Sequence, residues 1–309
     1  MTSSPQVVNS AVTRYADPLE TPRPAERSKR LRLNEGLRVF LRNKLAVAAA
    51  IALLLILLFC FIGPLVYHSS QSVQLADGNE APSLGHVLGT SPEGRDELGQ
   101  LMIAGQSTLE VGVGAALVAT LIGVLWGSVA GFIGGILDAL MMRLVDTVLS
   151  IPYLFFVVTI SAIIQPNLLL IILAVAIGGF PSAARVARGE VLRLRELDYV
   201  AAAKCSGSRL HNTIGRHITP NMLGVLVVNA TLNVAYAILA FASISFLGAG
   251  PPPPATNWGS ILTNGVNDIF NGYWWELWPA AALIVLTVLA VNVLGDSLGD
   301  LIERRNWRY

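Results

Sequence analysis

The sequence predicts an all-α polytopic membrane protein with six transmembrane helices, and three observations indicate this fold class. Of its 309 residues, 53% are hydrophobic and only 13% are charged, whereas soluble domains carry about 25% charged residues. The apolar residues form runs long enough to cross about 30 Å of hydrocarbon. Lysine and arginine gather in alternate loops between these runs, as the positive-inside rule requires of a chain that crosses a membrane repeatedly.

The first predicted domain, residues 1–37, is a polar and basic tail. Between positions 23 and 44 there are eight basic residues and two acids. This charge places the amino terminus in the cytoplasm, either as a flank of the first span or as a helix lying on anionic lipid.

The second predicted domain, residues 38–105, contains the first transmembrane helix and an external loop. Residues 45–67 carry no charge over 23 positions, which is enough to span the bilayer. Residues 68–106 then form a polar loop with five acids and one arginine, so we expect this loop outside the cell.

The third predicted domain, residues 106–309, is a five-helix core that begins with a span over residues 109–133. Glycines four residues apart lie on one face of this helix: Gly123, Gly127 and Gly131. This tandem GxxxG pattern predicts close packing against a neighbouring helix, rather than general tolerance of glycine. Gly134 and Gly135 then predict a tight cytoplasmic turn.

The third and fourth spans come from residues 147–184, which carry no charge over 38 positions. A single helix of that length would be about 57 Å long, so the Gln165-Pro166-Asn167 sequence is expected to divide it. Pro152 predicts a kink in the third span. Arg143 and Asp146, three residues apart, are expected to pair near the inner interface.

The fifth span, residues 221–247, carries polar side chains at a depth where each needs a partner or water. Asn229, Asn233 and Tyr236 are spaced i, i+4 and i+7 and form one stripe. One hypothesis is that this stripe lines a translocation path. The alternative is that it makes hydrogen bonds between helices.

The sixth span is predicted over residues 277–295, after an external segment at 249–275 that has no lysine or arginine. Trp274, Trp275 and Trp278 predict an aromatic belt at the outer interface. A charged carboxyl-terminal end follows, so both termini are expected in the cytoplasm.

The segment at 185–220 is basic and polar and connects the fourth and fifth spans. Its residues 200–204 are good helix formers, Gly207 suits a turn at positive φ, residues 209–218 predict a second short helix, and Pro220 suits the start of the next long helix. Such a hairpin on a membrane face is suited to binding another protein. Because it lies between membrane helices, it is poorly placed to bind nucleic acid.

The pattern Ala202-Ala203, then Gly207, then Ile218-Thr219-Pro220 resembles the EAA loop of bacterial ABC importer permeases. In that family the loop is a coupling helix that sits in a cleft of the cytoplasmic ATPase. Ala201 and Thr219 stand where the family has Glu and Leu. The resemblance implies that the residues coupling this chain to an ATPase are Tyr199, Ala201, Ala202, Ala203, Lys204, Gly207, Arg209, Ile218 and Pro220. For this motif alone, the alternative is an ordinary alanine-rich surface helix before a glycine cap.

A second motif at residues 88–96, LGTSPEGRD, resembles the LGTDxxGRD segment of the dipeptide/oligopeptide/nickel branch, in its C-type transmembrane subunit. Ser91 stands where that branch has Asp. Arg95 and Asp96 could dock a binding protein or pin the loop to its own domain, and we favour pinning. Further matches at 245–248 and 292–296 extend the resemblance over about residues 38–305.

Catalytic and metal-binding motifs do not occur in the sequence. There is no P-loop, HExxH, GxSxG or paired-carboxylate motif, the four histidines are dispersed, and Cys60 and Cys205 are expected at different depths, which disfavours a disulfide or a metal site. We therefore expect that this chain is not an enzyme and binds no cofactor. ATP and Mg²⁺ are expected in separate ATPase subunits.

The resemblance implies a type I ABC importer permease fold, and a transmembrane subunit that imports di- or oligopeptides across the bacterial inner membrane by alternating access. The implied partners are a homologous permease, which completes a heterodimer, two cytoplasmic ABC ATPase subunits or domains, an extracytoplasmic substrate-binding protein and membrane lipid. The alternatives are import of nickel chelates or glutathione by the same machinery, an ion-coupled secondary transporter, or a scaffold that transports nothing. A secondary transporter is disfavoured because the span centres lack Asp and Glu.

Overall fold

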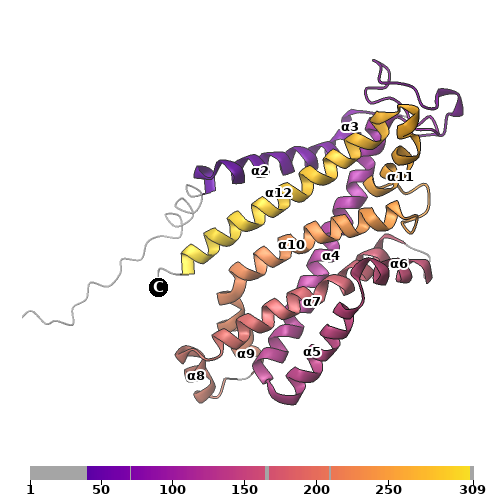
Figure 1. Ribbon diagram of the computed structural model, residues 1–309. Helices are drawn as coiled ribbons and strands as arrows, with labels where there is room; N and C mark the ends of the chain where they lie inside the picture. Colours follow the sequence, from indigo (N-terminus) through magenta and orange to yellow (C-terminus); the bar gives the residue numbers. More distant parts are fainter. Residues whose placement is uncertain (1–39, 70, 164–166, 209, 307–309) are drawn as a thin grey trace, which may run out of the picture.

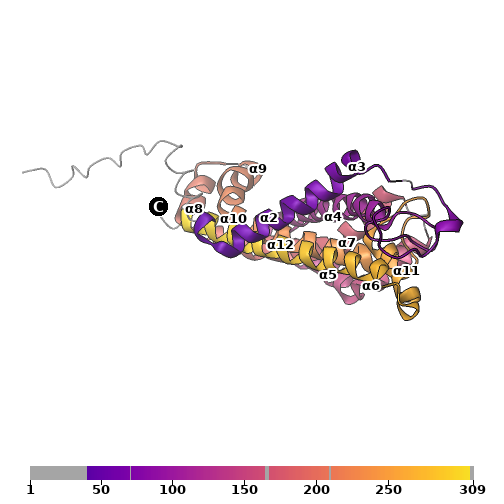
Figure 2. The same cartoon turned by 90° about the horizontal axis from the view of Figure 1, so that it is seen from above.

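The computed structural model describes residues 40–69, 71–163, 167–208 and 210–306, and over these residues the chain is a bundle of long helices (Figures 1 and 2). The predicted tail at 1–37, the Gln165-Pro166 part of the predicted outer turn, and Arg209 lie outside the described residues. The β pairing found within the described part is one isolated bridge, between Thr90 and Asp96. The predicted all-α class is confirmed.

Within the described residues, five helical stretches are long and apolar enough to cross a membrane. The first combines α2 (Lys44–Leu57), the π-helix η1 (Leu58–Ile62) and α3 (Gly63–Val66). The other four are single helices: α4 (Glu97–Ile133), α7 (Leu168–Leu194), α10 (Thr219–Phe246) and α12 (Trp274–Asn306).

The third predicted span is broken rather than kinked. It consists of α5 (Gly135–Ser150) and α6 (Tyr153–Ile163), which meet at an angle of 84°. Ile151 has extended backbone angles, φ −91° and ψ 125°, as expected for a residue before proline. The six predicted spans therefore correspond to five continuous stretches and one broken pair.

Three helices extend beyond their predicted ends, and one of them is α12, which covers residues 274–306 where the sequence predicted a span over 277–295. The prediction of a loop up to residue 106 is wrong, because α4 begins at Glu97, where the Asp96 carboxylate accepts a hydrogen bond from the Gly99 amide at 2.8 Å. With 37 residues, α4 is about 55 Å long and projects beyond the hydrocarbon. Helix α7 continues through Pro181 and ends at Leu194, beyond the uncharged run that ends at residue 184.

The glycine face of α4 lies directly against α7. A Cβ atom added at Gly123 would overlap the Ala183 side chain, and one at Gly127 would overlap the Ala184 carbonyl oxygen. Gly134 and Gly135 then turn the chain at φ +72° and +63°, which confirms the predicted turn.

An outer cap, named for the side on which the sequence predicts it and defined as residues 71–96 together with α11 (Trp258–Asp268), covers the ends of α4 and α12 at Glu97 and Trp274 (Figure 1). The cap also holds two short 3-10 turns, η2 (Leu75–Asp77) and η4 (Ile269–Asn271), the second between α11 and α12. Asp96 is 2% exposed and accepts a hydrogen bond from the Tyr67 hydroxyl at 2.9 Å, and it lies 3.0 Å from His86 Nδ1. The Asp96 carboxylate therefore pins the loop to its own domain.

Two predicted surface features differ in the structure. Trp275 is 6% exposed and its Nε1 donates to the Thr90 carbonyl at 3.4 Å, so its assignment to an aromatic belt is wrong. Trp274 and Trp278 are exposed. Asp146 pairs with Arg185 of α7 at 2.6 Å, and not with Arg143 as predicted.

Candidate functional site

The segment between α7 and α10 forms a helix–turn–helix at the end of the bundle opposite the outer cap (Figure 1). It contains α8 (Asp198–Cys205), α9 (Leu210–Thr213) and the π-helix η3 (Ile214–Ile218). Gly207 lies in the turn at φ +77°, as predicted, and Pro220 lies in the first turn of α10. We call residues 198–220 the coupling loop, after the role that the resemblance implies for this segment.

The coupling loop is anchored to the bundle by a hydrophobic cluster. Val200 of α8 and Ile218 of η3 are both fully buried. Their neighbours in the cluster come from α7 and α10, and part of α4 packs against it: Ala187, Val191, Leu194, Met222, Leu226, Val124 and Phe132. Because buried side chains pack at crystal-like density, the loop and these helix ends form one tightly packed unit.

Hydrogen bonds add to this anchoring. The Asn221 side chain donates to the Tyr199 hydroxyl at 3.3 Å, which joins α8 to the start of α10. The hydroxyls of Thr213 and Ser208 lie 3.1 Å apart and close the turn. Partial burial raises the pKa of the Tyr199 phenol, so this side chain stays neutral as an acceptor.

The structure divides the predicted coupling residues into an anchoring group and an exposed group. Ile218 is buried in the cluster, so its side chain faces the bundle and not a partner. Tyr199, Ala202, Gly207 and Pro220 are exposed. Ala201, Ala203 and Lys204 lie on α8 by their backbone, and their side chains are outside the described residues, as is Arg209.

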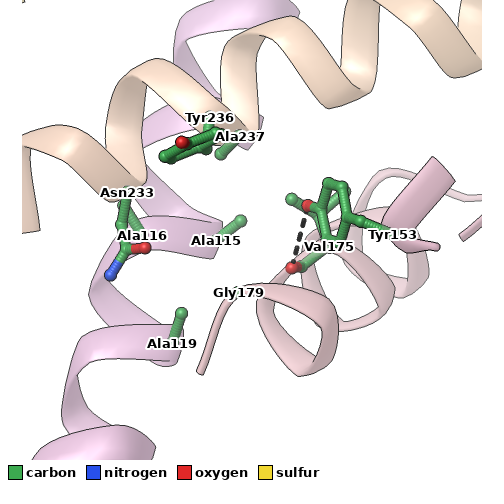
Figure 3. Close-up of a pocket in the computed structure, with 9 residues that line it drawn as sticks. All are labelled: Ala115, Ala116, Ala119, Tyr153, Val175, Gly179, Asn233, Tyr236 and Ala237. Atoms are coloured by element: carbon green, nitrogen blue, oxygen red, sulfur yellow. Dashed lines mark hydrogen bonds between the residues drawn. The ribbon is translucent and has the colours of Figure 1, made fainter. Parts of the chain in front are cut away.

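A hollow lies in the middle of the bundle, between α4, α6, α7 and α10 (Figure 3). The hollow is small, with a cavity volume of about 10 Å³, which is enough for about one water molecule. Most of its wall is made of small or apolar residues, and three polar side chains complete it. The lining residues are Ala115, Ala116, Ala119, Tyr153, Val175, Gly179, Asn233, Tyr236 and Ala237.

The structure places the polar stripe of the fifth span partly at the hollow and partly in hydrogen bonds between helices. Asn233 and Tyr236 line the hollow, and Tyr236 is 66% exposed. Asn229 does not line the hollow, and its Oδ1 accepts a hydrogen bond from Asn233 Nδ2 at 3.2 Å. The same Asn233 amide donates to Thr120 Oγ1 of α4 at 3.4 Å, so one member of the stripe also joins two helices.

The sequence reasoning missed Tyr153 and the alanines of α4. Tyr153 faces the hollow from α6, and its hydroxyl donates to the Val175 carbonyl at 3.2 Å (Figure 3). A signal for the alanines was present, because Ala115 and Ala119 continue the four-residue spacing of the α4 glycines towards the outer cap. One small-residue face thus packs against α7 at the glycines and lines the hollow at the alanines.

The side chains of the hollow can form hydrogen bonds with neutral polar groups. The hollow has amide and phenol groups in its wall, and none of its lining residues is charged. Within the part of the chain that the structure describes, no group of three or more His, Cys, Asp and Glu residues could hold a metal ion. Cys60 is buried and Cys205 is exposed, and both are free thiols.

The sequence matches the models of two known protein families. A family described as the binding-protein-dependent transport system inner membrane component matches residues 123–308, and one described as the N-terminal TM domain of oligopeptide transport permease C matches residues 32–82.

Individual relatives match over most of the chain. A dipeptide transport system permease protein of Bacillus subtilis is 38% identical, over 96% of this chain and 91% of its own length. Oligopeptide transport system permease proteins of Bacillus subtilis and Escherichia coli are 35% and 38% identical, over 85% and 87% of this chain and 87% and 90% of their own lengths.

Proposed function

Because the chain belongs to the family of binding-protein-dependent transport system inner membrane components, we propose that it is the transmembrane permease subunit of an ATP-driven importer of di- or oligopeptides. The similar proteins of Bacillus subtilis and Escherichia coli are named as dipeptide and oligopeptide permeases, and they support this substrate class. Nickel chelates and glutathione remain the alternative substrates for the same machinery.

In this proposal the chain works with other subunits in the inner membrane. It pairs with a homologous permease, receives substrate from an extracytoplasmic binding protein, and contacts two cytoplasmic ATPases through the coupling loop. ATP and Mg²⁺ are held by the ATPases. Both termini and the coupling loop lie on the cytoplasmic side, and the outer cap lies outside.

The observation that carries the proposal is the continuous packing from the coupling loop to the hollow. Val200 and Ile218 anchor the loop to α7 and α10. The same two helices supply Gly179 and Asn233 to the wall of the hollow, further along the bundle. A displacement of the loop by an ATPase therefore moves two walls of the hollow, which is the requirement for exposing it to alternate sides.

The uncharged wall of the hollow suits a mixture of peptides. Peptides of different sequence share backbone amides but differ in side-chain charge. A wall with hydrogen-bonding groups and no fixed charge favours none of these charge states over the others. Selection among peptides then falls to the binding protein.

The direct test is transport in vesicles that contain the permease pair, the ATPases and the binding protein. We expect a labelled dipeptide or pentapeptide to accumulate only with ATP and the binding protein present. Uptake driven by a proton gradient without ATP would instead indicate a secondary transporter, and the absence of uptake of any substrate would indicate a scaffold. Uptake of a nickel chelate or of glutathione, but of no other peptide, would reassign the substrate.

A further inference from the structure

Helix α5 is attached to the bundle mainly through polar contacts. Only Asp138 and Val145 of its residues are buried, and apolar side chains such as Leu140 and Leu144 are exposed. Figure 1 shows α5 at the edge of the bundle, beside α7. With so few buried side chains, van der Waals packing alone holds α5 weakly in place.

A bidentate ion pair supplies the missing attachment. Arg188 of α7 donates from Nε to Asp138 Oδ1 at 2.6 Å and from Nη2 to Oδ2 at 2.7 Å. The two side chains are 34% and 11% exposed. Two parallel charge-assisted hydrogen bonds fix the orientation of both side chains, so this pair holds α5 at a defined position along α7.

A second arginine binds on the α4 side of the Gly134–Gly135 turn, which connects α4 to α5. Arg195, two helical turns beyond Arg188, donates from Nη1 to the Gly131 carbonyl in the last turn of α4 at 2.8 Å. Arginine at such a site satisfies one of the carbonyls that a helix end leaves free. Arg188 and Arg195 thus hold both sides of the Gly134–Gly135 turn, and we call the two arginines, Asp138 and the Gly131 carbonyl the arginine clamp.

The clamp is continuous with the anchor of the coupling loop. Val191 and Leu194 lie between the two arginines in the sequence, and both belong to the cluster that buries Val200 of α8. At its far end, α5 is followed after Ile151 and Pro152 by α6, which supplies Tyr153 to the hollow. One connected path therefore runs from the loop through α7, the clamp and α5 to a third wall of the hollow.

We propose that Arg188 and Asp138 are positioning residues that make α5 and α6 move with the coupling loop, so that the Tyr153 wall shifts together with α7. This inference rests on the proposed function, since it assigns the clamp a part in the same transport cycle. Without the ion pair, α5 follows α7 less closely, although the bond from Tyr153 to the Val175 carbonyl still joins α6 to α7, and ATP is hydrolysed with an incomplete change of the hollow.

The chain offers a matched control on the same two helices. Arg185 and Asp146 also join α7 to α5, with Nη2 2.6 Å from Oδ1, but their side chains are 54% and 49% exposed. Exposed pairs of this kind contribute little, because water and salt screen them. Loss of the Arg185 pair is therefore expected to leave the position of α5 unchanged.

The experiment measures ATP hydrolysed per peptide imported, in vesicles that contain the complete complex. We expect Asp138→Asn and Arg188→Gln to raise this ratio about fivefold, the low end of typical coupling between sites, with normal amounts of assembled complex. Arg185→Gln is expected to leave it unchanged. Arg188→Lys, which keeps the charge and loses the bidentate geometry, is expected to give only partial rescue.

A distance measurement tests the clamp independently of transport. Spin labels are placed at Leu140 of α5 and Gly189 of α7, both exposed, after replacement of the exposed Cys205. The wild-type distance distribution is expected to be narrow with and without ATP, and that of Asp138→Asn to be broad. An unchanged distance distribution in Asp138→Asn would overturn the clamp. Failure of the wild-type complex to import any peptide would instead contradict the proposed function, and the distance measurement would still test the clamp. An unchanged ATP ratio in a transporting complex would also overturn the clamp.

Discussion

Replacing Gly207 with valine tests whether the shape of the coupling loop carries the coupling. Gly207 has φ +77°, and no atom lies within 4 Å of the place where a Cβ would be. The substitution therefore introduces backbone strain without a clash. An L-residue in this conformation costs about 1–2 kcal/mol, and a β-branched residue lies at the high end of that range.

The expected size of the effect follows from this strain. If the loop relieves the strain by adopting another turn, a strain energy of about 1–2 kcal/mol lowers the population of the original turn by a factor of about 5–30. Because Val200 and Ile218 remain buried, the anchor of the loop and insertion into the membrane are expected to be normal. Peptide uptake then falls by up to that factor, while ATP hydrolysis by the complex continues.

The assay compares uptake and ATP hydrolysis in vesicles for three variants. Gly207→Asn is expected to retain most of the uptake, since asparagine tolerates positive φ better than other residues with a side chain. Gly215→Val is the matched control in the same loop, with open space around the Cβ position and no positive φ. Wild-type uptake by Gly207→Val would refute the reasoning, and so would equal losses in all three variants.

Five other substitutions test three separate parts of the account. Ile218→Ala is expected to destabilise the anchor of the coupling loop by about 2–5 kcal/mol, seen as faster proteolysis within the loop at an unchanged rate elsewhere. Gly127→Ala forces α4 away from α7 and is expected to cost about 1–3 kcal/mol in thermal stability; Gly189→Ala, where a Cβ meets open space, is expected to be neutral. Leucine at Asn233 or Tyr236 is expected to lower uptake at normal expression, and unchanged uptake would remove these two side chains from the translocation path.

Local sequence signals predicted the features that depend on a few neighbouring residues. The positive φ of Gly207, the turn at Gly134 and Gly135, and the start of α10 near Pro220 follow from the conformational limits of glycine and proline. The long apolar runs likewise predicted where helices cross the membrane.

Features that depend on distant contacts could not be predicted from the sequence. The start of α4 at Glu97 could not be predicted, because its first turns contain polar residues. An apolar run indicates only the part of a helix that lies inside the hydrocarbon. Asp146 pairs with Arg185, 39 residues away, and Trp275 is buried by the outer cap. Pro152 signalled a bend, but the 84° angle that brings Tyr153 to the hollow depends on packing against α7.

The most direct test of the account uses Cys205, a free thiol exposed on the coupling loop. A short cross-linker that starts at this sulfur in inner membrane vesicles is expected to capture the ATPase subunit, with a yield that changes when ATP binds. A Cys205 thiol shielded by lipid, or one that captures no ATPase in a complex that imports peptide, would contradict the claim that this loop receives the motion that drives transport.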